Sequence, residues 1–141
     1  MRLSVFIAEQ PSTQLIIDLN KIYLNYLPES DLTETKINEI LAKPSTYLFM
    51  TMFNERHIGA VKVETESTKA TLSQLCIREI TRRRGIGKNL LKQIEKYLIS
   101  EGVVQVQYDL QEVTKDELSA TQAFLVESGY NITDTMAQKQ L

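Results

Sequence analysis

One short run of the sequence combines positive charge and glycine at a spacing that suits anion binding. It reads Arg82-Arg83-Arg84-Gly85-Ile86-Gly87, and Lys88 follows it. An arginine guanidinium group offers several N–H donors that match phosphate oxygens, and a glycine has no Cβ atom to keep a ligand away from the backbone. The residue types in this run therefore predict a binding site for phosphate or pyrophosphate.

A strand before this run and a helix after it would hold it in place. Residues 70–77 are rich in strand-forming side chains, and apolar residues at three- and four-residue steps predict a long helix over residues 87–101, with Gly102 as its stop signal. The first N–H groups of a helix have no intrahelical partner and lie at the positive end of its dipole, so they can bind a pyrophosphate. A simpler interpretation makes the arginines solvated loop charges and the glycines an ordinary turn. It is less favoured, because a glycine in the first turn weakens a helix by roughly 1 kcal/mol and needs a compensating reason.

The rest of the chain predicts a mixed α+β fold. Three strands in succession, over 46–53, 57–66 and 70–77, form an antiparallel meander that feeds the strand, glycine turn and helix described above. The result is a mostly antiparallel mixed sheet flanked by helices. The other predicted elements are a first strand from residue 3, helices over 13–25, 33–41 and 114–128, a strand over 103–110, and one or two closing strands over 130–141.

Composition narrows the function classes. A length of 141 residues with 43% apolar and 24% charged residues fits one soluble globular domain, spanning 1–141, and no segment predicts a membrane span or a secretory signal. With a net charge of −2, the chain as a whole has no positive electrostatic potential that would attract nucleic acid. One cysteine and one histidine exclude a disulfide framework and a zinc site, and we expect a cytoplasmic protein. Cys76 is expected to be a small buried or half-buried strand residue, and His57 a surface residue.

The basic turn resembles a motif of the GNAT superfamily of N-acetyltransferases. It is neither a Walker A loop nor the three-glycine dinucleotide motif, but its pattern R-x-x-G-x-G, placed between a strand and a long helix, is similar to the GNAT acyl-CoA pyrophosphate motif. The element order resembles the GNAT fold over the whole chain, which implies acetyl-CoA or CoA as the ligand. In this family the strand before the turn faces the pantetheine arm. The implied ligand-binding residues are Leu75, Cys76, Ile77, Thr81, Arg82, Arg83, Arg84, Gly85, Ile86, Gly87 and Lys88.

The sequence predicts no catalytic residue. Many GNAT enzymes carry a proton-donating tyrosine on the last helix, four residues before a glycine, and the matching residue here is Leu125, which has no proton to donate. A carboxylate on a strand is more often solvated than catalytic. The side chains that could be nominated as acid or base are Glu64, Glu66, Glu79 and Tyr108.

A longer run resembles one GNAT family in particular. Residues 75–87, L-C-I-R-E-I-T-R-R-R-G-I-G, are similar to the L-x-[VI]-R-E-[VI]-T-R-R-R-G-[VI]-G segment of the PanZ (PanM) family, and residues 18–22, 53–56 and 60–63 match in the same order. Members of this family are CoA-dependent regulators of aspartate 1-decarboxylase (PanD). The resemblance implies a factor that docks on the PanD precursor, promotes its self-cleavage to the pyruvoyl form and regulates the mature enzyme, so that pantothenate synthesis responds to CoA. Leu125 agrees with a binder more than with an enzyme.

Two alternatives and one partner surface remain predictions at this stage. The chain could be an active GNAT N-acetyltransferase acting on an amine or a protein, with another residue in place of the missing tyrosine. A nucleic-acid binder is disfavoured, because one arginine triplet without interleaved aromatic residues is a small electrostatic footprint. Asn54, in a hairpin turn, and Arg78, beside the ligand loop, are candidates for PanD binding, although an ordinary solvated turn explains Asn54 equally well. If the ligand orders residues 78–88 and this loop also faces the partner, the two binding events are positively linked.

Overall fold

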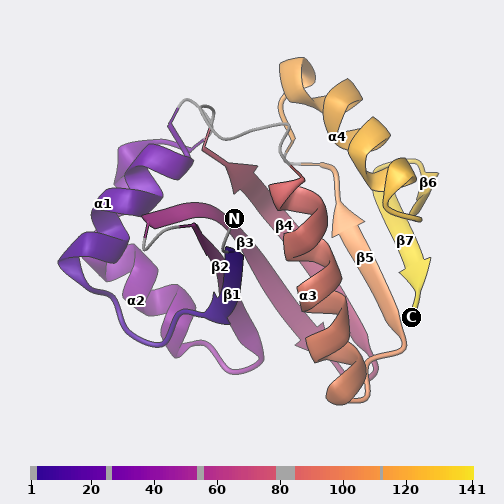
Figure 1. The fold of residues 1–141 in the computed structure, drawn as a ribbon, viewed down its shortest axis with the longest axis horizontal. Helices are drawn as coiled ribbons and strands as arrows, with labels where there is room; N and C mark the ends of the chain where they lie inside the picture. The colour runs from indigo at the N-terminus through magenta and orange to yellow at the C-terminus, as the bar shows by residue number, and fades with distance from the viewer. Residues whose placement is uncertain (1–2, 25–26, 54–55, 79–84, 112) are drawn as a thin grey trace.

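The computed structural model describes residues 3–24, 27–53, 56–78, 85–111 and 113–141 (Figure 1). The predicted order of helices and strands is confirmed, with two closing strands and a short 3₁₀ helix that the apolar pattern did not predict. The elements are β1 (Leu3–Ile7), α1 (Thr13–Ile22), η1 (Glu29–Asp31), α2 (Glu34–Ala42), β2 (Thr46–Phe53), β3 (Arg56–Glu66), β4 (Lys69–Ile77), α3 (Ile86–Ser100), β5 (Gln105–Asp109), α4 (Lys115–Glu127), β6 (Asn131–Thr133) and β7 (Met136–Gln140).

The seven strands form one mixed sheet in the order β1-β2-β3-β4-β5-β7-β6. Every neighbouring pair is antiparallel except β4 and β5, which run parallel and pair only from Lys69 with Gln105 to Leu72 with Tyr108. Beyond these four residue pairs the ladder between the two strands stops. The fold class predicted from sequence is confirmed, and the sheet has a weak seam in its middle.

The helices cover the sheet from two sides, because side chains alternate along each strand. Leu48 and Met50 of β2 belong to the core cluster of α1 and α2, whereas Phe49 between them belongs to the cluster of α3 and α4. Figure 1 shows α1 and α2 together at one end of the sheet and α3 lying across its middle. None of the helices in the described part of the chain is long and apolar enough to cross a membrane.

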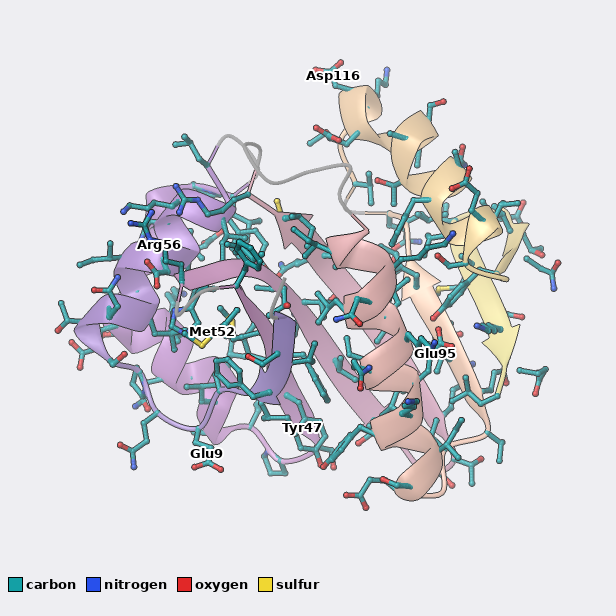
Figure 2. The ribbon with its side chains drawn as sticks, viewed as in Figure 1. Glu9, Tyr47, Met52, Arg56, Glu95 and Asp116 are labelled. Carbon is teal, nitrogen blue, oxygen red and sulfur yellow. The ribbon has the colours of Figure 1, made fainter. Side chains whose placement is uncertain are left out.

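Helix ends follow local chemistry. Ser12 Oγ accepts a 3.1 Å hydrogen bond from Leu15 N at the start of α1, and Thr33 Oγ1 accepts one of 3.3 Å from Lys36 N at the start of α2. The acids of α4's first turn, Asp116 and Glu117, lie at the positive end of that helix, and Figure 2 shows Asp116 at its tip. Each of these three helices therefore begins with groups that satisfy or complement its N-terminus.

Three strands approach one another closely around Gly59. A Cβ atom on Gly59 of β3 would lie 2.8 Å from Cγ2 of Thr51 and 2.5 Å from Cδ1 of Ile77, so only glycine fits there without a shift. Thr51 is fully buried, and among the described residues its Oγ1 is the buried side-chain polar atom without a hydrogen-bond partner. Close packing at Gly59 therefore lies beside the Thr51 hydroxyl, which has no hydrogen-bond partner among the described residues.

Candidate functional site

A cavity of about 550 Å³ opens between the C-terminal end of β4, the N-terminal end of α3 and one face of α4. A volume of this size lies in the range of small-molecule sites, roughly 300–1,000 Å³. It brings together seven of the residues predicted from sequence, while Thr81, Arg82, Arg83 and Arg84 lie outside the described residues. The lining residues are Leu75, Cys76, Ile77, Gly85, Ile86, Gly87, Lys88, Tyr108, Glu117, Ala120, Thr121, Phe124 and Glu127.

The start of α3 is open toward this cavity. Gly85, its N-cap, has a φ of 75°, in the left-handed region that favours glycine, and a Cβ atom there would meet nothing within 4 Å. Unlike α1 and α2, α3 has no side-chain hydrogen bond from its N-cap, and unlike α4 it has no acid in its first turn. The described residues thus place no N-cap side chain and no first-turn acid at the positive end of this dipole, which suits an anion, and Lys88 adds a further positive charge.

Gly87 has a role that the sequence interpretation did not assign. We expected both glycines to admit a ligand, but a Cβ atom on Gly87 would lie 3.1 Å from Cζ and 3.3 Å from Cε1 of Phe124. The missing side chain lets the Phe124 ring of α4 pack against the first turn of α3. Gly85 fits the predicted role of an open backbone, whereas Gly87 allows a close contact between two helices.

Hydrogen bonds from two neighbouring elements hold the β4 residues that line the cavity. Cys76 is 4% exposed, as a buried strand residue should be, and its Sγ donates a 3.1 Å hydrogen bond to the carbonyl oxygen of Ile22 in α1. The backbone N–H of Leu75 donates a 2.9 Å hydrogen bond to the hydroxyl of Tyr108 on β5. Tyr108 is only 1% exposed, so its ring is part of the core and its oxygen part of the site.

Known proteins share both the sequence and the fold. The sequence model of the family described as "Acetyltransferase (GNAT) domain, PanZ" matches residues 2–138. The PanD regulatory factor of Escherichia coli K12 is 35% identical over 94 residues, which are 67% of each chain, and that of Salmonella typhimurium is 36% identical over 94 residues, again 67% of each chain. The chain belongs to the PanZ family.

Solved structures agree with this membership. The putative N-acetyltransferase YhhK of E. coli, in a solution structure bound to coenzyme A, superimposes with a TM-score of 0.80 at 28% identity over 100% of both chains. The PaiA N-acetyltransferase of Thermoplasma acidophilum, in complex with coenzyme A, gives 0.77 at 16% identity over 100% of both chains, which shows the shared GNAT fold.

In this PanZ chain the residue at the usual position of the GNAT proton donor is part of the core. Leu125 is fully buried in the cluster of α3 and α4, next along α4 from Phe124, which lines the cavity. Of the other acid or base candidates, Glu64 and Glu66 are exposed, as expected for a solvated strand face, and Glu79 lies outside the described residues. Tyr108 is the candidate that the fold brings to the cavity.

The interpretation of His57 as a surface residue was wrong. Its side chain is 14% exposed, and Nδ1 lies 2.5 Å from Oδ2 of Asp18 in α1. Its ring also packs against Phe6, with the ring centroids 5.7 Å apart. A hairpin position suggested solvent, but α1 lies over the start of β3 and covers the imidazole. Across the described residues, no group of three or more metal-ligating side chains is assembled.

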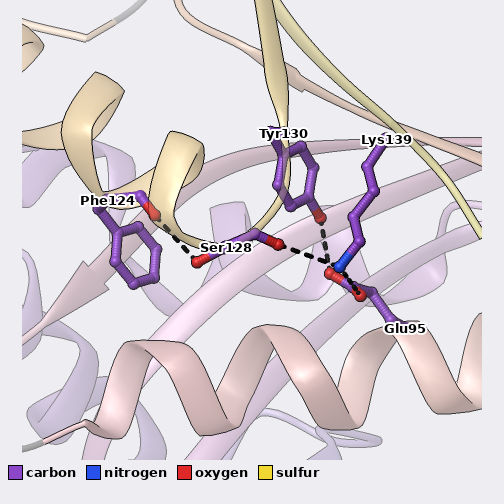
Figure 3. A network of polar contacts seen from close by, with 5 residues as sticks. All are labelled: Glu95, Phe124, Ser128, Tyr130 and Lys139. Carbon is purple, nitrogen blue, oxygen red and sulfur yellow. Dashed lines mark hydrogen bonds and ion pairs between the residues drawn. The ribbon is translucent and has the colours of Figure 1, made fainter.

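A polar network that sequence reasoning missed joins the C-terminal end of α4 to the middle of α3 (Figure 3). Lys139 Nζ of β7 lies 2.7 Å from Oε1 of Glu95 on α3 and donates a 3.0 Å hydrogen bond to the carbonyl of Ser128, just after α4. Tyr130 donates to Oε2 of the same carboxylate, and burial, followed by the charge of Glu95, raises the pKa of this phenol. Paired charges therefore tie the C-terminal end of α4 to α3, next to Glu127, which lines the cavity.

The structure describes one of the two residues that the sequence predicts to bind the partner. Asn54 lies outside the described residues. Arg78 follows β4 directly and is half-buried, and its backbone N–H donates a 2.7 Å hydrogen bond to the carbonyl oxygen of Ile58. Arg78 is therefore anchored to β3 at the C-terminal end of β4, and the basic turn follows it in the sequence.

Proposed function

We propose that this chain is a CoA- or acetyl-CoA-dependent regulatory factor that binds aspartate 1-decarboxylase (PanD), promotes its self-cleavage to the pyruvoyl form and regulates its activity. The observation that carries the proposal is the cavity at the open start of α3, in a chain of the PanZ family. Two bacterial relatives are PanD regulatory factors, and YhhK was solved with coenzyme A bound. Through this activity the chain would adjust pantothenate synthesis to the level of CoA.

The chemistry of the cavity matches the two halves of CoA. Its polar lining includes the first turn of α3 with Lys88, and in the sequence Thr81 and the arginines 82–84 come just before this turn, a combination that suits a pyrophosphate. Its apolar lining includes Leu75, Ile77 and Phe124, with Cys76 of the same strand, which suits the less polar pantetheine arm. No step of chemistry on the ligand is needed for a sensor of this kind.

Regulation fits the site better than acetyl transfer. A GNAT enzyme protonates the departing thiolate, and the buried Leu125 has no proton to give. The alternative function, N-acetyl transfer to an amine or a protein, rests on the fold and on Tyr108, the one side chain of the four nominated from sequence that lines the cavity within the described residues. A thiol-release assay with acetyl-CoA and a panel of amines separates the two, because sustained turnover would favour the enzyme.

We also propose that residues 1–141 form one domain and that the protein acts in the cytoplasm. Both core clusters draw on strands of a single sheet, and the β2, β3 and β4 strands contribute to both of them. The chain's one cysteine has no second cysteine with which to form a disulfide, which suits a reducing compartment.

For the partner surface we propose Arg78, which follows β4, together with Asn54, which comes next after β2 in the sequence. Arg78 connects β4 to the loop that leads to the ligand site, so a ligand that orders this loop meets its ordering cost before the partner arrives. Partner and ligand would then each raise the affinity for the other by the same factor.

Calorimetry and a processing assay test the proposal. The purified protein should bind CoA, and it should convert PanD precursor to its cleaved form, followed by mass spectrometry, faster with CoA than without. Lys88→Gln, and the joint change of Arg82, Arg83 and Arg84 to glutamine, should each weaken CoA binding at least about tenfold, since a hydrogen bond to a charged group contributes roughly 1.5–3 kcal/mol. The matched control is Lys92→Gln, because Lys92 is an exposed cation on the same helix. Equal PanD processing with and without CoA would refute the proposal.

A further inference from the structure

The strand that borders the cavity is bent at one place. Ser73 of β4 pairs with Lys62 of β3, and Cys76 pairs with Ala60, so Gln74 and Leu75 together face the single residue Val61. This is a bulge with one extra residue. Gln74 has a φ of 56°, a left-handed conformation that costs a non-glycine residue about 1–2 kcal/mol. A strained bulge persists only where its surroundings hold it.

The bulge lies where β4 and β5 part. Their parallel ladder ends at Leu72 and Tyr108, immediately before the bulge. In a continuous parallel ladder the next N–H groups of β4 would bond to the backbone of β5. Instead, the N–H of Leu75 donates to the side-chain oxygen of Tyr108 at 2.9 Å. The Tyr108 hydroxyl therefore takes the place of a backbone acceptor where the two strands part, and both Leu75 and Tyr108 line the cavity.

A second tyrosine holds the bulge from α1. The hydroxyl of Tyr23, which caps the C-terminal end of α1, donates a 2.6 Å hydrogen bond to the carbonyl oxygen of Gln74. Tyr23 is 2% exposed and belongs to the core cluster of α1 and α2, whereas Tyr108 belongs to that of α3 and α4. The single peptide group that joins Gln74 to Leu75 is thus held at both of its polar atoms, at its C=O by Tyr23 of one core cluster and at its N–H by Tyr108 of the other.

We propose that Tyr23 and Tyr108 are positioning residues for the ligand: their hydroxyl groups hold the Gln74 bulge in the conformation that keeps β4 and β5 apart, so that the cavity admits the pantetheine arm of CoA. The inference rests on the proposed function of the cavity. It adds that the width of the arm's channel is set by two side chains, neither of which belongs to the basic turn. Loss of either hydroxyl lowers the fraction of the protein in the open conformation, and the apparent affinity falls by that fraction.

The test compares two ligands on three variants. Tyr108→Phe and Tyr23→Phe keep the rings and remove only the hydroxyl groups, and Tyr47→Phe, on β2 away from the cavity, is the matched control. In calorimetry, Tyr108→Phe and Tyr23→Phe should each bind CoA about fivefold to tenfold more weakly than the wild type, which is the loss expected for one hydrogen bond. Both should bind adenosine 3′-phosphate 5′-diphosphate, which lacks the arm, within about twofold of the wild type. General loss of folding would lower both affinities together, so the difference between the two ligands is specific to positioning.

Amide exchange of the ligand-free protein gives a second readout. The N–H of Leu75 should exchange at least about tenfold faster in Tyr108→Phe than in the wild type, because its acceptor is gone. Unchanged exchange at Leu75, or equal CoA affinities of wild type, Tyr108→Phe and Tyr23→Phe, would overturn this inference alone. If the wild type failed to bind CoA, the proposed function would fall, and the role assigned to the two tyrosines would fall with it.

Discussion

The hydroxyl of Tyr130 lies 3.0 Å from Oε2 of Glu95, so the segment that follows α4 is fastened to the middle of α3 (Figure 3). Lys139 completes the network and lies over the Tyr130 ring, 5.7 Å from its centroid. Tyr130 is 2% exposed, and the carboxylate beside it disfavours a phenolate. The junction between the two helices that line the cavity therefore depends on a phenol that keeps its proton.

This junction predicts a loss of stability in alkali. Because burial and Glu95 raise the pKa of Tyr130 in the folded protein, the unfolded chain loses its proton first, above about pH 10. The free energy of unfolding should then fall by up to about 1.4 kcal/mol per pH unit from this residue, while its contribution is constant below pH 10. Denaturant unfolding from pH 8 to 11.5 should show a shallower fall in Tyr130→Phe than in the wild type. A Tyr47→Phe variant serves as control, and equal slopes for Tyr130→Phe and wild type would contradict the prediction.

Thr51→Val should stabilise the protein. The side chain is fully buried and its hydroxyl has no partner among the described residues, while valine has nearly the same shape. An unsatisfied buried polar group costs about 1–3 kcal/mol, so the free energy of unfolding should rise by about 1 kcal/mol or more. Thr71→Val is the comparison, because Thr71 Oγ1 accepts a 3.0 Å hydrogen bond from Gln107. A lower stability of Thr51→Val would show that the hydroxyl is satisfied in solution.

The contact between Gly87 and Phe124 should appear as a coupling energy. Gly87→Ala places a methyl group against the ring, so its cost should be greater in the wild type than in a Phe124→Leu background. In a double-mutant cycle of unfolding free energies we expect a coupling of at least about 0.5 kcal/mol. Gly102→Ala, whose new Cβ would meet nothing within 4 Å, should be additive with Phe124→Leu. Additivity at Gly87 would mean that the ring moves away without cost.

Replacing Leu125 with the tyrosine of GNAT enzymes should not create an enzyme. The side chain is fully buried, so a larger ring overpacks the core and should cost about 1–3 kcal/mol of stability. Val126→Tyr is the control, since Val126 is 57% exposed and its replacement should be nearly neutral. The prediction fails if Leu125→Tyr is as stable as the wild type, or if it releases thiol from acetyl-CoA in the presence of an amine.

The sequence predicts most of this fold because its signals are local. The helix stop at Gly102, the strand over 46–53 and the start of a helix at Thr33 are each confirmed, and each depends on a few adjacent residues. The ends of helices are predicted less accurately than their presence: the helix predicted over 13–25 ends at Ile22. The burial of His57 could not be predicted, because it depends on α1, whose Asp18 is distant in the chain.

The site divides in the same way. The motif around Gly85 predicts the start of α3, and the strand before it predicts the residues of β4 that line the cavity. The α4 wall, with Glu117, Thr121 and Phe124, has no motif, since only the packing of α4 against α3 brings it there. Likewise, nothing in the types of Tyr23 and Tyr108 marks them, because their bonds reach across 51 and 33 residues.

The short parallel ladder between β4 and β5 has a consequence for the order of folding. Consecutive hairpins can assemble β2, β3 and β4 rapidly, whereas β5 can join them only after α3 has crossed the sheet, so we expect the panel of β5, β6 and β7 to dock late. Contacts that form after the transition state alter the unfolding rate more than the folding rate. A molecule bound across this seam would therefore act as a kinetic lock, lengthening the lifetime of the native protein while leaving its rate of folding almost unchanged.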